Sequence, residues 1–345
     1  MPPTDPRRSR LPAVLAALTL TLVATLVAGT LIGPARIGIG DLLSLLAGGA
    51  GEQTTWQQTI LWQVRLPRVL TGALVGAALA LSGAVLQGLF RNPLASPSVL
   101  GVSSGASLGA VIMIFFGLSA SQVWALPLGA FAGALATLLV VYAIATHRGH
   151  TPLATLLLAG IAVGAFNVAM SSFVLAIALE SWEVGRTIVY WTMGGLDGAT
   201  WDHAKLIAPV LILGLALVMS YQRELDALLV GEVHAAAIGV DVARTRLLLL
   251  VATALLTGAA VAVAGGIGFI GLVVPHIVRL LVGPQHRALL PLSALAGAWI
   301  LVFADLLLRG LLGEHAIPLG VVTAAMGAPF FLFLLLRQQR RGLDG

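Results

Sequence analysis

The stretch LPRVLTGALVGAALALSGAVLQGL, residues 66–89, contains a single charged side chain, that of Arg68. A helix of about 20 apolar residues, rising about 1.5 Å per residue, crosses the roughly 30 Å hydrocarbon core of a membrane. The apolar residues of this stretch run on without the alternation that is typical of a barrel strand. The stretch therefore predicts a membrane-spanning helix.

The composition of the whole chain extends this prediction. Of its 345 residues, 59% are hydrophobic and 10% are charged, and the mean hydropathy is +1.01. Soluble domains carry about 25% charged residues. We therefore expect an all-α polytopic membrane protein in which residues 1–345 form one transmembrane domain.

Charge and cysteine content exclude several classes of function. A net charge of +5 and a pI near 10.6 could indicate a nucleic-acid partner. The arginines, however, are scattered at the ends of apolar runs rather than gathered on one polar face, so we expect no nucleic acid. The chain has no cysteine, which excludes disulfides, thiolate metal sites and thiol catalysis.

Turn residues and charges divide the chain into ten candidate spans. The N-terminal apolar run is longer than the 7–15 residues of a signal-peptide core, so it is expected to stay as the first span. The ten spans lie near residues 11–33, 66–89, 98–117, 122–145, 151–179, 201–221, 245–265, 268–283, 288–312 and 317–336.

The distribution of basic residues predicts the orientation of these spans. An even number of spans places both termini on one side, and the segments on that side contain 13 of the 19 Lys and Arg residues. Because basic residues favour the cytoplasmic side, we expect both termini in the cytoplasm.

Spans 2–5 and spans 7–10 then have opposite topology, which is typical of an inverted repeat. The second span of each group is also broken by glycine and proline, in residues 92–109 and in residues 265–275. Interrupted segments at matching positions indicate a transport path. The alternative is that these glycines only allow close helix packing. After span 5, residues 181–191 predict a short interfacial or re-entrant helix.

Several kinds of chemistry are not supported. The chain has no phosphate-binding P-loop, because its only lysine, Lys205, has no preceding glycine loop. Asp305 is the only acid well inside a span, and it stands one turn from Arg309, so a local ion pair is favoured over an ion-coupling carboxylate. His147 and His150 have no third ligand nearby, and His276 is expected to be a packing residue. We expect neither a catalytic site nor a metal site.

One internal segment does not belong to a membrane. LLVGEVHAAAIGVDVARTR, residues 228–246, is rich in charged residues and alanine, and it predicts a short soluble helix within residues 222–243 on the cytoplasmic side. A protein without its own ATPase that carries such a helix needs a soluble partner. The alternative is a solvated loop.

Three blocks together resemble one family. They are residues 65–109, which begin RLPRVLTGALVGAALALSGAVLQGLFRNPLASP, residues 228–246, and residues 268–309 with their continuation to Arg337. The chain resembles the membrane-spanning permeases of ABC importers for iron-siderophore complexes, haem and vitamin B12. The likeness covers about residues 40–337.

The resemblance implies a ten-helix permease domain that works as a homodimer in the inner (plasma) membrane. Two ATPase subunits, which carry the ATP and Mg²⁺, would bind in the cytoplasm, and a substrate-binding protein would dock outside. The permease itself would bind no cofactor. The implied cargo is an iron chelate, siderophore or haem, ahead of cobalamin and oxyanions; an ion-coupled secondary carrier is the alternative of a different class.

The resemblance also assigns roles to particular residues. Gly231, Glu232, Ala235 and Gly239 match the family's ATPase-coupling motif, and Arg65, Arg68 and Arg309 match its docking arginines. A structural alternative for the arginines is that Arg309 pairs with Asp305 while the other two reach lipid phosphates.

A gate and an outer mouth complete the assignments. The path would lie between spans 5 and 10, with a cytoplasmic gate at Thr151, Leu153, Ala154 and Thr155. Tyr190, Met193 and His203 are candidates for contact with cargo at the outer mouth, although an interfacial or packing role is the commoner one for each.

Overall fold

The computed structural model describes residues 6–33, 37–40, 42, 56–122, 124–146, 152–311 and 317–343. The elements that it contains are all helical, and a π-helical turn at Leu61–Arg65 joins two of them. The α-helices are α1 (Pro6–Leu31), α3 (Trp56–Ile60), α4 (Leu66–Leu89), α5 (Val102–Phe115), α6 (Leu118–Ser121), α7 (Ala125–Ala145), α8 (Leu153–Ala178), α9 (Trp182–Met193), α10 (Trp201–Ser220), α11 (Gln222–Val230), α12 (Glu232–Ala237), α13 (Val242–Ala264), α14 (Ile270–Val282), α15 (His286–Leu311) and α16 (Leu319–Leu343).

The described residues contain 7 helical segments that are long and apolar enough to cross a membrane. These are Leu11–Leu31, Trp56–Leu89, Ala125–Ala145, Leu153–Ala178, Trp201–Ser220, Val242–Ala264 and His286–Gly310. The other three expected spans correspond to shorter apolar helices, Val102–Phe115, Ile270–Val282 and Leu319–Leu332. The all-α membrane fold is confirmed, and ten complete crossings stay a prediction.

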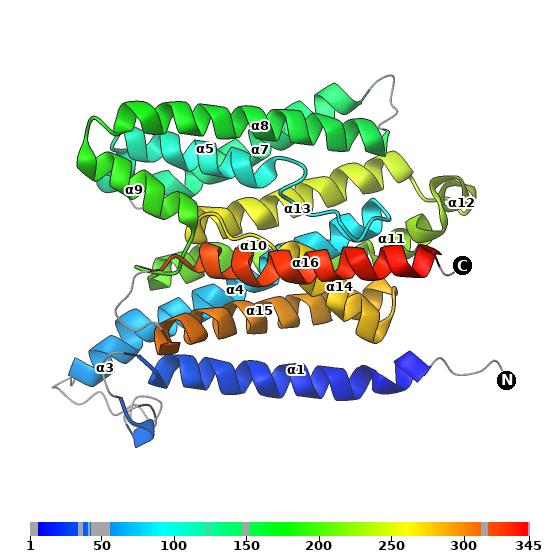
Figure 1. Ribbon diagram of the computed structural model, residues 1–345. Helices are drawn as coiled ribbons and strands as arrows, with labels where there is room; N and C mark the ends of the chain where they lie inside the picture. Colours follow the sequence, from blue (N-terminus) through cyan, green and yellow to red (C-terminus); the bar gives the residue numbers. More distant parts are fainter. Residues whose placement is uncertain are drawn as a thin grey trace.

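The centre of the bundle is α4, which packs against α13, α14 and α15. Of the 18 most apolar consecutive residues of the Trp56–Leu89 segment, 83% are buried within the chain. For α8 the same share is 22%. In Figure 1 α8 lies along the edge of the bundle. Residues 66–89, predicted above to span the membrane, therefore form the helix around which the others assemble.

Glycines bring the central helices into backbone contact. A Cβ atom at Gly76 of α4 would lie 2.2 Å from the carbonyl oxygen of Gly297 in α15, and a Cβ at Gly297 would meet Gly76 equally closely. Gly105 and Gly109 of α5 contact α7 in the same way. At Gly105 and Gly109 the expected close packing of helices is therefore present, as is common between membrane helices.

The two glycine- and proline-broken regions are unwound links that lead into short helices. The first link ends at Gly101 (φ 72°) and opens α5, and the second ends at Phe269 (φ 65°) and opens α14. α5 has 14 residues and α14 has 13. These matching interruptions fit the expected inverted repeat, which itself stays a prediction.

The bundle has two distinct ends. In Figure 1 the start of α1, the end of α16 and the helices α11 and α12 lie at one end, on the right. α3 and α9 lie at the opposite end, on the left. The two chain ends therefore share a face with residues 222–243, as an even number of crossings requires. That this face is cytoplasmic stays a prediction from the basic residues.

Candidate functional site

The segment 222–243, which we call the coupling segment, contains the short helix that the sequence predicted. It forms two helices, α11 and α12, separated by Gly231. Gly231 has φ 146° and ψ 154°, a conformation that side-chain-bearing residues rarely adopt. The predicted short helix corresponds to α12, and Gly231 separates it from α11.

The four motif residues of the coupling segment shape its backbone. Gly239 (φ 91°) follows the end of α12, where Val240 N–H donates to the Ala235 carbonyl at 3.0 Å and Gly239 N–H donates to the Ala236 carbonyl at 3.0 Å. This pair of bonds is a Schellman cap, which favours glycine. The Ala235 side chain is buried, and Glu232 forms an ion pair with Arg246 of α13.

A second polar contact ties the coupling segment to the bundle. Asp226 of α11 accepts hydrogen bonds through Oδ1 from the backbone N–H of His286, at 2.9 Å, and from its ring Nδ1, at 2.7 Å. His286 is the first residue of α15 and is fully buried. α11 therefore caps α15, just as α12 is attached to α13 through Glu232 and Arg246.

α12 and the residues on either side of it expose apolar side chains, next to the exposed His234. Val233 is 87% exposed, and Val230 and Ile238 on either side are also exposed. We call these three residues the apolar tip. Exposed valine and isoleucine at the end of a charged segment indicate a protein-contact surface. The apolar tip was missed from the sequence because six helical residues are too few to define a periodic face.

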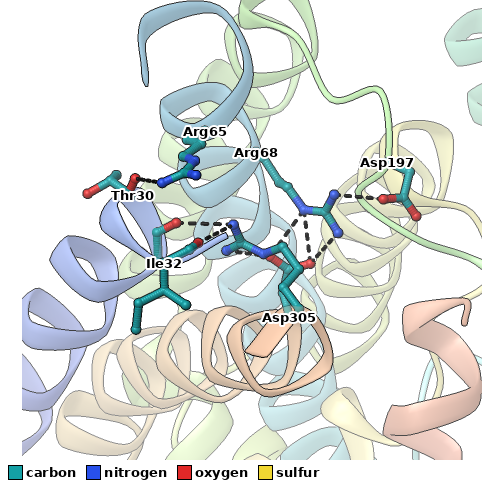
Figure 2. Close-up of polar contacts among 8 residues, drawn as sticks. Thr30, Ile32, Arg65, Arg68, Asp197 and Asp305 are labelled. Carbon is teal, nitrogen blue, oxygen red and sulfur yellow. Dashed lines mark hydrogen bonds and ion pairs between the residues drawn. The ribbon is translucent and has the colours of Figure 1, made fainter. Parts of the chain in front are cut away.

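At the opposite end, two of the three predicted docking arginines, Arg68 and Arg309, contact Asp305, and Figure 2 shows Arg65 beside Thr30. Arg68 of α4 forms an ion pair with Asp305 of α15 at 2.7 Å through Nη2, and a second one with Asp197 at 2.6 Å through Nη1. Arg309 reaches Asp305 at 3.0 Å. The predicted Arg309–Asp305 pair is confirmed, and we call Arg68, Asp197, Asp305 and Arg309 the outer charge cluster.

Arg65 and Arg309 have a further role at the end of α1. Arg65 Nη1 donates to the carbonyls of Thr30 and Leu31, at 3.0 and 2.6 Å, and Arg309 Nη1 donates to Gly29 at 3.1 Å and Ile32 at 3.3 Å. The last carbonyls of a helix have no partner within the helix, and cationic side chains stabilise them. Two arginines from other helices thus cap the C-terminus of α1.

These contacts limit how much of each arginine a partner could reach. Arg65 is buried, and the side chains of Arg68 and Arg309 are 16% and 12% exposed. The docking role stays a prediction, and of the three side chains Arg68 is the most exposed. The expectation that Arg65 and Arg68 reach lipid phosphates gives way to contacts within the chain.

The predicted gate lies at the start of α8, at the same end as the coupling segment (Figure 1). Leu153 is half-buried, whereas Ala154 and Thr155 are exposed on the first turn. Thr151 lies outside the described residues, as do His147 and His150. The gate residues described therefore occupy an accessible helix start, and their role stays a prediction.

The outer-mouth candidates separate into two groups. Tyr190 and His203 line one cavity of about 800 Å³ beside α9, whereas Met193 is not among its lining residues. Arg186 lies 5.4 Å from the centre of the Tyr190 ring. His203 Nδ1 accepts a hydrogen bond from the Thr200 backbone N–H at 3.1 Å, which closes a capping box at the start of α10. His203 therefore has a structural role, as was the commoner expectation.

The sequence of the chain matches known proteins over nearly its full length. Residues 18–337 match the model of the FecCD transport family. The chain is 51% identical, over 83% of its length and 76% of the relative's, to the cobalamin import system permease protein BtuC of Halobacterium salinarum. It is 43% identical, over 97% and 96% of the two chains, to the vitamin B12 import system permease protein BtuC of Klebsiella pneumoniae.

A solved structure has the same fold. It is an inward-facing conformation of a metal-chelate type ABC transporter, with a TM-score of 0.84 and 34% identity, and the match covers 94% of this chain and 99% of the other. With a family model matched over residues 18–337, a helical membrane bundle and relatives of matching length, the chain belongs to the FecCD transport family and is a membrane-embedded permease of an ABC importer.

Proposed function

We propose that this permease imports cobalamin or a closely similar corrinoid. The observation that carries this proposal is the match to two permeases of cobalamin import, at 51% and 43% identity, the second over 96% of the relative's length. This ranking reverses the expectation from the sequence, which placed iron chelates first. An iron chelate is the second candidate, favoured by the likeness to a metal-chelate type transporter.

ATP hydrolysis belongs to a separate subunit in this proposal. The part of the chain that the structure describes offers an exposed apolar tip at Val230, Val233 and Ile238, next to two helices anchored to the bundle by Asp226 and Glu232. An apolar tip that is attached to the bundle suits insertion into a cleft of a partner. The apolar contact gives affinity, and the contacts of Asp226 and Glu232 transmit movement of the partner to the bundle. The partner holds ATP and Mg²⁺, and this chain holds no cofactor.

A homodimer completes the pathway. One face of α8 is exposed in the single chain. It is formed by the apolar side chains of Leu158, Ile161, Phe166, Val168 and Phe173. α8 corresponds to span 5, which the family resemblance places at the dimer axis. A substrate-binding protein docks at the end that carries α9, with Arg68 as the principal contact in the outer charge cluster. Both termini are cytoplasmic.

The proposed mechanism is alternating access. ATP binding closes the ATPase pair, the coupling segment moves with it, and the displacement passes through Asp226 to α15 and through Glu232 to α13. Packed helices shift as units rather than deforming continuously, so movement at one end of the bundle opens the path at the other.

The test is uptake into proteoliposomes that contain the permease with its ATPase subunit and binding protein. We expect ATP-dependent uptake of cyanocobalamin, and much less uptake of a ferric siderophore or of haem. Uptake of the siderophore or haem alone would favour the second candidate. Uptake driven by a proton or sodium gradient without ATP would instead support a secondary carrier.

A further inference from the structure

Arg68 is held by two carboxylates that differ sharply in their surroundings. The side chain of Asp305 is 1% exposed, and that of Asp197 is 70% exposed. Arg68 donates hydrogen bonds to Asp305 from Nε at 3.0 Å and from Nη2 at 2.7 Å. It donates a further hydrogen bond to Asp197 from Nη1 at 2.6 Å. Figure 2 shows the guanidinium between the two carboxylates. One carboxylate thus fixes the guanidinium from within, while the other covers its outward edge.

The two ion pairs also differ in strength. A buried pair is costly to break, because removal of one partner leaves the other charge without water or counter-charge. The pair with Asp197 is open to water on the side of Asp197, where water and salt screen it, so it contributes less. The contact with Asp197 is therefore the one that an incoming carboxylate can replace, while Asp305 keeps Arg68 in position.

The backbone around Asp197 allows such a replacement. Before it, Gly195 N–H donates to the Ala264 carbonyl at 2.8 Å, and after it the Thr200–His203 capping box fixes the start of α10. Gly198 has φ 74°, and a Cβ there would have no neighbour within 4 Å. The short arc 197–199 thus lies between two fixed points with open space beside it.

We propose that Asp197 is an internal stand-in for a carboxylate of the substrate-binding protein, and that docking displaces it from Arg68. In the free permease Asp197 neutralises Arg68 and closes the outer charge cluster. When an acidic side chain of the binding protein takes the Nη1 edge, Asp197 swings away and the arc 197–199 is released. This inference rests on the docking role of Arg68 proposed above and adds its regulation.

Asp197 also connects the docking surface with the outer mouth. It lines the cavity of about 800 Å³ together with Tyr190 and His203. Its loop joins α9 to α10. Occupation of Arg68 by the binding protein therefore changes the wall of the cavity into which cargo is delivered.

The first experiment measures the affinity of the cobalamin-loaded binding protein for the permease in nanodiscs. Asp197→Asn removes the competing charge, so we expect about two- to fivefold tighter binding. The matched control is Asp202→Asn, which removes an exposed carboxylate at the start of α10 that contacts Lys205 and not Arg68. The control should match the wild type. Arg68→Gln should weaken the affinity for the binding protein, both in the wild type and in Asp197→Asn.

The outcomes separate the inference from the docking proposal. If Arg68→Gln weakens binding but Asp197→Asn leaves it unchanged or weaker, docking stands and the stand-in role of Asp197 is wrong. If Asp202→Asn tightens binding as much as Asp197→Asn does, the tighter binding comes from removal of any negative charge on this surface. That result would also overturn the stand-in role. If Arg68→Gln has no effect, both proposals fail.

A second measurement needs no binding protein. Phenylglyoxal modifies accessible guanidinium groups, and mass spectrometry reads the rate at Arg68. We expect Arg68 to react several times faster in Asp197→Asn than in the wild type or in Asp202→Asn. Equal rates in the three proteins would show that Asp197 does not cover Arg68 and would overturn the inference.

Discussion

At the end of the bundle that carries α9, charged side chains surround an Asp305 carboxylate that is 1% exposed, whereas at the opposite end the protruding side chain of Val233 is 87% exposed. Both ends were expected to receive a partner protein. At the first end, ion pairs within the chain already occupy the charges. At the second end, the polar residues attach the coupling segment to the bundle and leave apolar side chains facing outward.

The difference shows how residue type relates to role in this fold. Buried charges at the α9 end hold α1, α4 and α15 together, so their removal should affect folding before it affects a partner. The apolar tip is largely exposed in the single chain, so its removal should affect a partner more than folding. Mutation of the buried Asp305 should therefore reduce stability, whereas mutation of the apolar tip should reduce association with the ATPase subunit.

The largest effect is expected for Asp305→Ala. This change leaves Arg68 and Arg309 close together without the carboxylate between them, and the loss of one partner of a buried ion pair costs about 3–5 kcal/mol. Denaturant unfolding of the purified protein in mixed micelles measures the cost. Asp202→Ala, at an exposed site, should stay within about 0.5 kcal/mol of the wild type. Similar values for the two variants would contradict a structural role of the outer charge cluster.

The next effect concerns the apolar tip. Val233→Asp combined with Ile238→Asp should weaken binding of the ATPase subunit at least about 30-fold, or about 2 kcal/mol, because it places charges at the centre of an apolar contact. The unfolding free energy should not change. Arg223→Ser, an exposed polar change in α11, serves as the control and should bind normally. Unchanged binding by the double variant would mean that the tip meets no partner.

A smaller effect is expected within the coupling segment. Ala235 is fully buried, so Ala235→Trp overpacks the contact of α12 with the rest of the chain and should destabilise it by about 1–3 kcal/mol. Ala236→Trp places the same side chain on the exposed face and should spare stability. Limited proteolysis of the segment distinguishes the two variants. Equal protease resistance would show that α12 is not packed as described.

The smallest effect is expected for Glu232→Gln. The Glu232 side chain is 43% exposed, and its amide replacement keeps an oxygen that can accept a hydrogen bond from Arg246. The contact between α12 and α13 should therefore weaken by about 1 kcal/mol or less. Glu232→Arg should cost more, because it sets two positive charges against each other. The ratio of ATP hydrolysed to cargo transported, measured for both variants, tests this order.

The membrane fold could be predicted because span length and hydropathy are local properties. A run such as residues 66–89 shows its role without knowledge of its neighbours, and the basic residues add an expected orientation. The pairing of Asp305 with Arg309 could also be predicted, since the two residues are one helical turn apart. The location of the coupling segment between two spans followed from its charge.

The remaining features depend on contacts between distant residues. Arg68 meets Asp197 across 129 positions and Asp305 across 237, and no pattern near Arg68 indicates either partner. The break at Gly231 depends on its backbone angles. These cannot be predicted from the sequence, because the neighbouring alanines favour a continuous helix. The use of Arg65 to cap α1 depends on where the first helix ends in space, which its own sequence does not specify.

The central claim is that this chain is a transport subunit whose energy comes from a separate ATPase bound at α12. The most direct test is ATP hydrolysis by the purified permease in proteoliposomes, alone and with the ATPase subunit, for the wild type and the Val233→Asp, Ile238→Asp variant. We predict no hydrolysis by the permease alone, and cargo uptake coupled to hydrolysis only when the wild-type permease is combined with the ATPase subunit. ATP turnover by the permease alone, or normal coupled uptake by the double variant, would contradict the account.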